Sequence, residues 1–174
     1  MERKGVVTFK GKGMTLAGQA VKAGDKAPEF TSLDNNLNEV TLKDFKGKVK
    51  LISVTPSLDT PVCDAQARRF NSEAAKLPDS CVVVNVSMDL PFAISRFCAT
   101  AGVEKVKTLS DHRDASFGIA YGVLVKELRL LARSVFVIDA EDKVRYVEVI
   151  PEITNHPDYE KALDEARKLL AIRA

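Results

Sequence analysis

The sequence predicts an α/β fold in which a central mixed sheet is flanked by helices and preceded by an N-terminal β-hairpin extension. Between residues 49 and 121, short apolar runs alternate with segments whose apolar residues have helical spacing. Such alternation is typical of an α/β layer with a parallel component. Two further pairs of apolar runs, at residues 6–18 and 135–150, are each interrupted by a short turn signal. Each of these pairs predicts a hairpin.

The N-terminal hairpin is expected from Val6–Lys10 and Met14–Gly18, which flank the turn Gly11-Lys12-Gly13. Glycines between two runs of this length are a strong turn signal. We regard residues 1–20 as an appendage to the core. A loop at 24–28 and short strands near 30–33 and 40–42 then lead to the first central strand.

Strands and helices alternate through the rest of the chain. The expected elements are a buried strand at 49–55, a helix at 61–76, a strand at 82–87, a helix at 91–100, a short strand at 106–110, a helix at 114–121, and paired strands at 135–140 and 144–150. The segment 122–125 is interpreted as a short buried or interface loop. A C-terminal helix is predicted from an apolar stripe formed by Tyr159, Ala162, Leu163, Ala166, Leu169 and Leu170.

The length and composition of the chain limit the classes of protein to which it can belong. A chain of 174 residues with 45% hydrophobic residues is expected to form one domain over residues 1–174. The net charge is +2, and lysine and arginine are scattered among aspartate and glutamate, so neither nucleic acid nor a membrane surface is an expected partner. The N-terminus lacks the apolar core of a signal peptide, which favours a cytoplasmic location.

Three widely spaced cysteines, an odd number, argue against a structural disulfide framework and favour redox or catalytic use. Cys81 begins an apolar strand and is interpreted as a core residue. The three cysteines and His112 could nominally make a zinc site, but no two cysteines have the close spacing of metal ligands. We therefore expect no metal.

Cys63 lies at the predicted junction of a strand and a helix. With Thr60 as N-cap, Pro61 occupies the first helical position and Cys63 the third. The unsatisfied N–H groups of the first turn and the positive end of the helix dipole favour a thiolate over a thiol. Because the thiolate is the nucleophilic form of cysteine, Cys63 is the candidate reactive residue.

The spacing Pro56-x-x-x-Thr60-x-x-Cys63 resembles the peroxidatic loop of the peroxiredoxin family. The segment 87–98, Ser-Met-Asp-Leu-Pro-Phe-Ala-Ile-Ser-Arg-Phe-Cys, is similar to the thiol peroxidase branch of that family. Further similar segments follow in collinear order at 108–111, 120–123, 132–139 and 152–159. The resemblance covers almost the whole chain and implies a thioredoxin-like fold with an N-terminal extension.

The resemblance also implies roles for site residues in the reduction of hydrogen peroxide and organic hydroperoxides. Cys63 would attack the terminal oxygen of the hydroperoxide and become a sulfenic acid. The Thr60 hydroxyl would orient the reacting atoms, and Arg133 would stabilise the thiolate and the developing oxyanion. Pro56 would shield the sulfur from bulk water. From the residues alone, Thr60 could simply cap the helix and Arg133 could simply pair with a carboxylate.

Cys98, which lies 35 positions after Cys63, is the candidate resolving residue. Cys63 opens one predicted helix and Cys98 closes another, whereas a disulfide needs Cα atoms within roughly 7 Å. We therefore expect both helix ends to unwind locally before an intramolecular disulfide forms. By resemblance, thioredoxin or a similar dithiol would reduce that disulfide, the protein would be a homodimer, and neither haem nor flavin would be needed.

Two other classes of function remain open from the sequence. A thiol–disulfide oxidoreductase would reduce protein disulfides directly, although the chain lacks the adjacent resolving thiol of a Cys-x-x-Cys motif. A non-enzymatic redox sensor would use the oxidation of Cys63 to signal to a partner protein.

Overall fold

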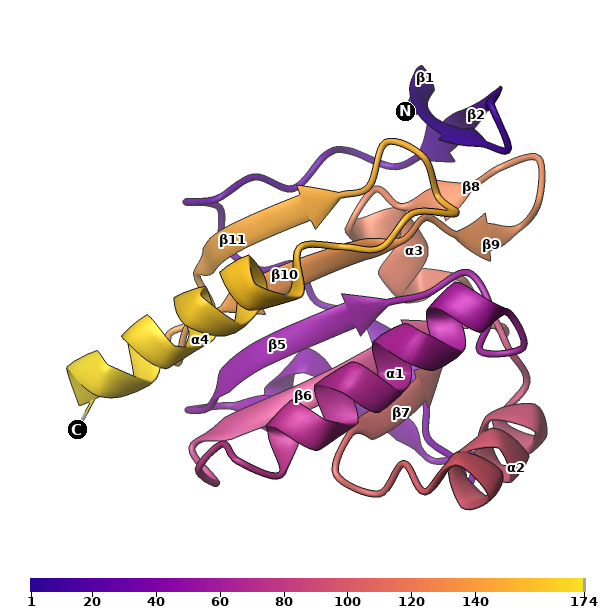
Figure 1. Cartoon of the computed structure of the whole chain (residues 1–174). Helices are drawn as coiled ribbons and strands as arrows, with labels where there is room; N and C mark the ends of the chain where they lie inside the picture. The colour runs from indigo at the N-terminus through magenta and orange to yellow at the C-terminus, as the bar shows by residue number, and fades with distance from the viewer. Residues whose placement is uncertain (174) are drawn as a thin grey trace.

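The computed structural model describes residues 1–173 and contains two sheets (Figure 1). The strands of the larger sheet are β3 (Thr31–Leu33), β4 (Glu39–Thr41), β5 (Val49–Val54), β6 (Cys81–Ser87), β7 (Lys107–Ser110), β10 (Ser134–Ile138) and β11 (Val144–Val149). Their order is β11-β10-β5-β6-β7-β3-β4. β5, β6 and β7 pair in parallel, and the remaining neighbours pair antiparallel, so the predicted mixed sheet is confirmed.

Helices cover one face of the larger sheet. They are α1 (Pro61–Ala74), α2 (Pro91–Ala101) and α4 (Tyr159–Arg173). Phe70 of α1 and Leu163 of α4 pack with Val49 and Leu51 of β5 in one buried apolar cluster. Ile52 and Val54 belong to a second cluster, because neighbouring side chains of a strand point to opposite faces. The sheet therefore has a core on each side.

The second core lies under the N-terminal hairpin and α3 (Ser116–Ala120). In Figure 1, α1 and α4 lie in front of the larger sheet, and α3 lies farther from the viewer, between α1 and the hairpin. The aromatic rings of Phe117 and Tyr121 stack at a centroid distance of 4.2 Å, and both contact Phe136 of β10. These rings connect the hairpin side of the molecule to the central strands.

The predicted hairpin is confirmed as β1 (Glu2–Phe9) and β2 (Lys12–Ala17). It continues into a four-stranded sheet, because β2 pairs with β8 (Leu124–Val125) and β8 pairs with β9 (Leu130–Leu131). The interpretation of residues 122–125 as a loop is therefore wrong for Leu124 and Val125. Two-residue strands carry no periodicity of their own, so the sequence contains no local signal for them.

Gly122 shows how closely the hairpin approaches this region. Its φ is +68°, and a Cβ atom there would lie 2.3 Å from the carbonyl oxygen of Gln19. Only glycine tolerates both the left-handed backbone and this contact. The hairpin is thus packed tightly on the segment that follows α3.

Most predicted boundaries agree with the structure to within one or two residues. The strand expected at 40–42 ends at Thr41, since Leu42 begins a short 3₁₀ helix, η1 (Leu42–Phe45). The Asp44 carboxylate accepts a 2.7 Å hydrogen bond from the Thr41 N–H and fixes that turn. In α4, Ala162, Leu163 and Ala166 of the predicted stripe are buried.

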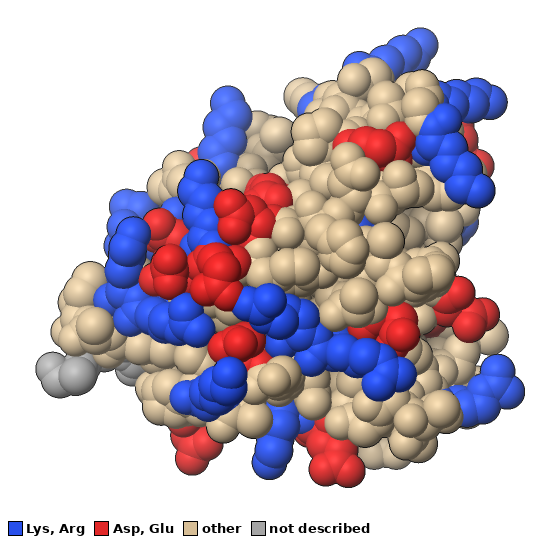
Figure 2. All heavy atoms as spheres, viewed as in Figure 1, with Lys and Arg blue, Asp and Glu red and all other residues tan. Residues whose placement is uncertain are grey.

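Charged side chains of both signs are interspersed over α1 and α4 in Figure 2, where several of them form ion pairs. The surface between the hairpin and the N-terminal end of α1 is mostly uncharged in this view. Within residues 1–173, no helix combines the length and the apolar character that a membrane crossing requires.

Candidate active site

Cys63 occupies the first turn of α1, where the sequence placed it. Thr60 has the extended backbone of an N-cap, with φ −122° and ψ 150°, and Pro61 is the first helical residue. The Thr60 carbonyl accepts the first helical hydrogen bond, at 2.9 Å from the Asp64 nitrogen. Cys63 is therefore the third helical residue, and its side chain is completely buried. The free N–H groups of this turn favour a negative charge on the sulfur.

Arg133 lies beside this sulfur. Its Nη2 donates to Cys63 Sγ at 3.2 Å, its Nη1 donates to Gln66 Oε1 at 2.8 Å, and its Nε donates to the Ile153 carbonyl at 2.8 Å. Arg133 is only 2% exposed. None of these three acceptors is a carboxylate, so the alternative of a simple ion pair with an acidic residue does not describe Arg133. A buried, permanently charged donor fixed at this distance stabilises a thiolate.

Gln66 orients the arginine and was missed by sequence reasoning. Its Nε2 donates to Ser53 Oγ at 2.7 Å, which directs its Oε1 toward Arg133. Asn85 also donates to Ser53 Oγ, at 3.3 Å, so β5 and β6 both support the arrangement. The signal for Gln66 was present, since a residue three positions after Cys63 lies on the same helix face.

Thr60 and Pro56 flank the thiol along the chain. Thr60 is an N-cap by position, but its hydroxyl donates to the Ser57 carbonyl at 3.0 Å and makes no hydrogen bond to a helix N–H. In this conformation the hydroxyl is also not bonded to Cys63. Pro56 is buried and follows the end of β5, where the Thr55 N–H donates to the Val86 carbonyl. The loop is thus anchored at its start and exposed near Thr60.

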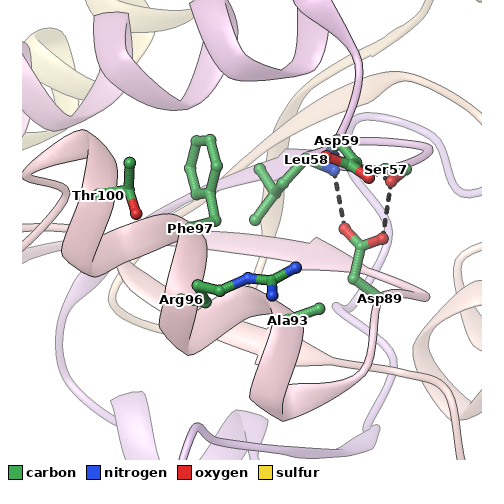
Figure 3. Close-up of a pocket in the computed structure, with 8 residues that line it drawn as sticks. All are labelled: Ser57, Leu58, Asp59, Asp89, Ala93, Arg96, Phe97 and Thr100. Carbon is green, nitrogen blue, oxygen red and sulfur yellow. Dashed lines mark hydrogen bonds between the residues drawn. The ribbon is translucent and has the colours of Figure 1, made fainter.

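Asp89 holds the middle of this loop, as Figure 3 shows. Its carboxylate accepts from Ser57 Oγ at 2.7 Å, from the Leu58 N–H at 2.8 Å and from Ser87 Oγ at 3.0 Å. Sequence reasoning did not single out Asp89. A signal existed, because Asp89 follows β6 and the carboxyl ends of neighbouring parallel strands meet at one edge of a sheet.

Cys98 lies on α2 and is not bonded to Cys63, since all three cysteines are free. It is half-buried and packs against a small apolar cluster of Leu58, Ala67 and Ile94. Its Sγ donates to Thr108 Oγ1 at 3.8 Å, a weak contact. Burial raises the pKa of Cys98, and the hydrogen bond with Thr108 partly opposes that effect. The structure thus brings Arg133 to Cys63 and leaves Cys98 in separate surroundings.

Cys81 begins β6 and is half-buried against the helix-side core. Burial raises its pKa to about 11. It is therefore a neutral thiol at physiological pH, which is the form expected of an unreactive core cysteine.

A cavity of about 310 Å³ separates the loop before α1 from α2. Figure 3 shows it between Phe97 and Arg96 of α2 on one side and Leu58 on the other. Its remaining lining residues are Ser57, Asp59, Asp89, Ala93 and Thr100. The cavity lies between α2, which carries Cys98, and the loop that leads into α1, which carries Cys63, but neither sulfur lines it. Among the described residues, no group of three or more histidine, cysteine, aspartate or glutamate side chains could hold a metal ion.

Comparison with curated sequences gives close relatives over almost the full chain. A thiol peroxidase from Halalkalibacterium halodurans is 66% identical over 164 residues, which cover 94% of this chain and 98% of the relative. A thiol peroxidase from Bacillus subtilis is 61% identical with the same coverage.

Comparison with solved structures confirms the expected thioredoxin-like fold. The crystal structure of a peroxiredoxin-like protein from Aquifex aeolicus matches with a TM-score of 0.88 at 40% identity, over 96% of this chain and 97% of that one. A thiol peroxidase from Chromobacterium violaceum matches with a TM-score of 0.81 over 93% and 95% of the two chains, and at 20% identity it shows the fold alone. A family model described as Redoxin matches residues 22–163. This chain therefore belongs to the Redoxin family.

Proposed function

We propose that this protein is a thiol-dependent peroxidase that reduces hydrogen peroxide and organic hydroperoxides through Cys63. The observation that carries the proposal is the 3.2 Å contact between Cys63 Sγ and the buried Arg133 guanidinium at the N-terminus of α1. The thiol peroxidases that are 66% and 61% identical to this chain over 164 residues support the same activity. A lone nucleophilic sulfur with fixed donors is suited to attack an O–O bond.

In the first step, the Cys63 thiolate attacks the terminal oxygen of the hydroperoxide. An S–O bond forms, the O–O bond breaks, and the leaving oxygen takes a proton and departs as water or an alcohol. Cys63 is then a sulfenic acid and the peroxide has been reduced by two electrons. Arg133 stabilises both the thiolate and the charge that develops on oxygen, while the Thr60 hydroxyl orients the peroxide once it turns from Ser57 toward the site.

In the second step, Cys98 loses its proton and its thiolate attacks the sulfenic sulfur; the S–S bond forms, the S–O bond breaks, and the oxygen takes up a proton and leaves as water. The two sulfurs are held on different helices, with Leu58, Ala67 and Ile94 in the cluster against which Cys98 packs. Closing the disulfide therefore requires the first turn of α1 and the last turn of α2 to open. Crystal structures of the reduced and oxidised protein with superimposable backbones at 60–66 and 94–100 would contradict this step.

An external dithiol of the thioredoxin type then restores both thiols by thiol–disulfide exchange.

We also assign the protein to the cytoplasm as a single-domain homodimer, without a nucleic-acid partner. The exposed apolar side chains of Leu90 and Phe92, at the start of α2, support a contact surface between two copies. Sedimentation of the reduced protein at low concentration tests the dimer, and a stable monomer would contradict it.

The activity is tested by following peroxide consumption with a thioredoxin system for the wild type and three serine variants. We expect Cys63→Ser to lose all turnover. We expect Cys98→Ser to lose thioredoxin-linked turnover, although its Cys63 should still be oxidised once by one equivalent of peroxide. Cys81→Ser is the matched control and should resemble the wild type. Turnover at catalytic protein concentrations would exclude a stoichiometric sensor, and an insulin-reduction assay separates the peroxidase from a general disulfide reductase.

A further inference from the structure

The carbonyl of Ile153 is one of the three acceptors that hold Arg133, and this carbonyl lies outside the central sheet. Its segment, residues 151–154, follows β11 and pairs with the end of β1. The Thr8 N–H donates to the Pro151 carbonyl at 2.7 Å, and the Ile153 N–H donates to the Thr8 carbonyl at 2.9 Å. Ile153 is thus bonded to the N-terminal hairpin through its N–H and to Arg133 through its carbonyl.

Glu152 fastens this segment to the hairpin. Its Oε1 accepts from Thr8 Oγ1 at 3.0 Å and from the Gly11 N–H at 2.8 Å. Its Oε2 accepts from the Thr154 N–H at 2.9 Å and from Thr154 Oγ1 at 2.7 Å. All four donors are neutral groups, and no ion pair explains the carboxylate's position. One side chain therefore joins the end of β1 and the hairpin turn to the residue that follows Ile153.

These hydrogen bonds also fix the charge state of Glu152. The backbone N–H groups of Thr154 and Gly11 lower the pKa of its carboxyl to about 2. The group is therefore ionised at neutral pH, where both of its oxygens act as acceptors. A glutamine at this position would turn an N–H₂ group toward one of the two donor pairs.

We propose that Glu152 is a positioning residue for Arg133, and that the N-terminal hairpin acts through it as part of the support of the active site. By holding residues 151–154 on Thr8 and Gly11, Glu152 sets the place of the Ile153 carbonyl. That carbonyl fixes the Nε side of the guanidinium, whose Nη2 contacts Cys63 Sγ. The catalytic meaning of this chain of contacts rests on the proposed function of Cys63.

If Glu152 only attached the hairpin, loosening the hairpin at another point would affect Arg133 in the same way. The molecule contains a matched control for this alternative. Glu127 is also a carboxylate that holds the hairpin, since its oxygens accept from the Thr15 N–H at 3.1 and 3.0 Å. It attaches the hairpin to the turn between β8 and β9, which makes no contact with Arg133 among the hydrogen bonds of the described residues. Loosening the hairpin at Glu127 should therefore leave Arg133 in place.

The test is the second-order rate constant for oxidation of Cys63 by hydrogen peroxide, measured by rapid mixing in five proteins. These are the wild type, Glu152→Gln, Arg133→Lys, the double variant of these two, and the control Glu127→Gln. We expect Glu152→Gln to lower the rate constant roughly fivefold or more when Arg133 is present, and by less than about twofold in the Arg133→Lys background, because residues that act through one another are not additive. Glu127→Gln should stay within about twofold of the wild type.

A second readout does not depend on turnover. The Nε–H resonance of Arg133, assigned by its loss in Arg133→Lys, should shift and exchange faster with solvent in Glu152→Gln but not in Glu127→Gln. If Glu152→Gln does not fold, Thr154→Val removes one hydroxyl donor to Oε2 and should shift the same resonance to a smaller extent.

The outcomes separate the two proposals. An unchanged rate constant and an unchanged resonance in Glu152→Gln overturn the positioning role while leaving the peroxidase intact. An equal loss of rate with and without Arg133 overturns it as well. A wild type that consumes no peroxide overturns the proposed function, and the resonance of Arg133 still decides whether Glu152 positions it.

Discussion

Cys63 and Cys98 occupy contrasting surroundings. Cys63 is fully buried and accepts a hydrogen bond from Arg133, which is itself held by Gln66 and by the Ile153 carbonyl. Cys98 is half-buried, and its contact with the Thr108 hydroxyl is 3.8 Å long. The first sulfur therefore lies in a buried site next to a charged side chain that is itself held by two further hydrogen bonds. The second has apolar neighbours such as Ile94 on one side and the polar side chain of Thr108 on the other, with no charged group bonded to it.

The helix ends that carry the two thiols also differ. The first turn of α1 is anchored from within by Arg133 and Gln66. The end of α2 is held from outside, where Arg68 Nη1 donates to the Ala101 carbonyl at 3.2 Å and Asn71 Nδ2 donates to the Gly102 carbonyl at 3.4 Å. Exposed contacts of this kind contribute little stability. We infer that peroxide reduction depends on the contacts that hold Cys63 and Arg133 in place. Disulfide formation depends instead on how easily the end of α2 is released.

The largest expected effect concerns the fixed site. Replacing Arg133→Lys removes the planar fork that reaches Cys63, Gln66 and Ile153 at once, and should lower the rate constant of Cys63 oxidation by about 100- to 1000-fold. Rapid mixing with hydrogen peroxide measures this step. Arg145→Lys is the matched control, because Arg145 pairs with Asp139 away from the thiol. If Arg133→Lys were oxidised at Cys63 as fast as the wild type, the guanidinium would not be what makes Cys63 more reactive than Cys98.

The next effect concerns the pH dependence of disulfide formation. Burial raises the pKa of Cys98, so the closed conformation favours its neutral thiol at and below neutral pH. That preference is lost as the pH rises through the ordinary thiol pKa of about 8.5 toward the raised value. The thiolate is also the attacking form, so the rate should increase about tenfold per pH unit below that range.

This step is measured by mixing the reduced protein with one equivalent of peroxide at about pH 6.5 to about 8.5, below and up to the ordinary thiol pKa, then quenching with acid and counting disulfides by mass spectrometry. Thr108→Val removes the hydrogen bond that opposes the rise in the pKa of Cys98, so it should slow the step at neutral pH. A rate that is flat with pH in both proteins would show that the Cys98 thiol is not the group that limits disulfide formation.

A smaller effect is expected at the loop between the two sites. Asp89→Asn leaves one acceptor oxygen for three donors from Ser57, Leu58 and Ser87, so the loop before α1 should loosen. We expect about a tenfold slower oxidation of Cys63, because small misplacements of reacting groups have large effects on rate. Asp59→Asn, an exposed neighbour that lines the same cavity, should change the rate little. Equal rates for both variants would contradict the role of Asp89.

The smallest effect tests the releasable end of α2. Asn71→Ala removes the contact with the Gly102 carbonyl and the 2.8 Å acceptor for the Lys105 N–H. Stability should fall by about 1 kcal/mol, and disulfide formation should become roughly two- to fivefold faster. Arg167→Ala, which disrupts exposed ion pairs on α4, should affect the disulfide step less. A slower disulfide step in Asn71→Ala would contradict local opening of α2.

The sequence allowed the prediction of features that depend on local rules. Thr60, Pro61 and Cys63 obey the preferences of a helix N-terminus, so the position of the thiol within its helix turn could be inferred without a structure. The hairpin at residues 2–17 and the parallel strands β5 and β6 follow from turn signals and apolar runs. These signals are each contained within a few neighbouring residues.

What could not be predicted depends on contacts between distant segments. Arg133 lies 70 residues from Cys63 along the chain, and only the packing of β10 beside β5 brings the two together. The Thr60 hydroxyl was expected at the thiol, but its orientation toward Ser57 depends on the conformation of the loop. Glu152 contacts a hairpin more than 140 residues away, and no periodicity within its own segment points to that partner.

Because β5 and β6 are parallel, their carboxyl ends meet at one edge of the sheet and their amino ends meet at the opposite edge. The carboxyl ends of both strands lead into Pro56 and Asp89, so the chemistry is gathered there, while their amino ends lead away from it. The turn at 77–80, between α1 and β6, lies at the amino edge and is largely exposed (Figure 1). A fluorescent reporter domain could therefore be spliced into that turn to make a genetically encoded peroxide probe, since exposed turns remote from function accept insertions best.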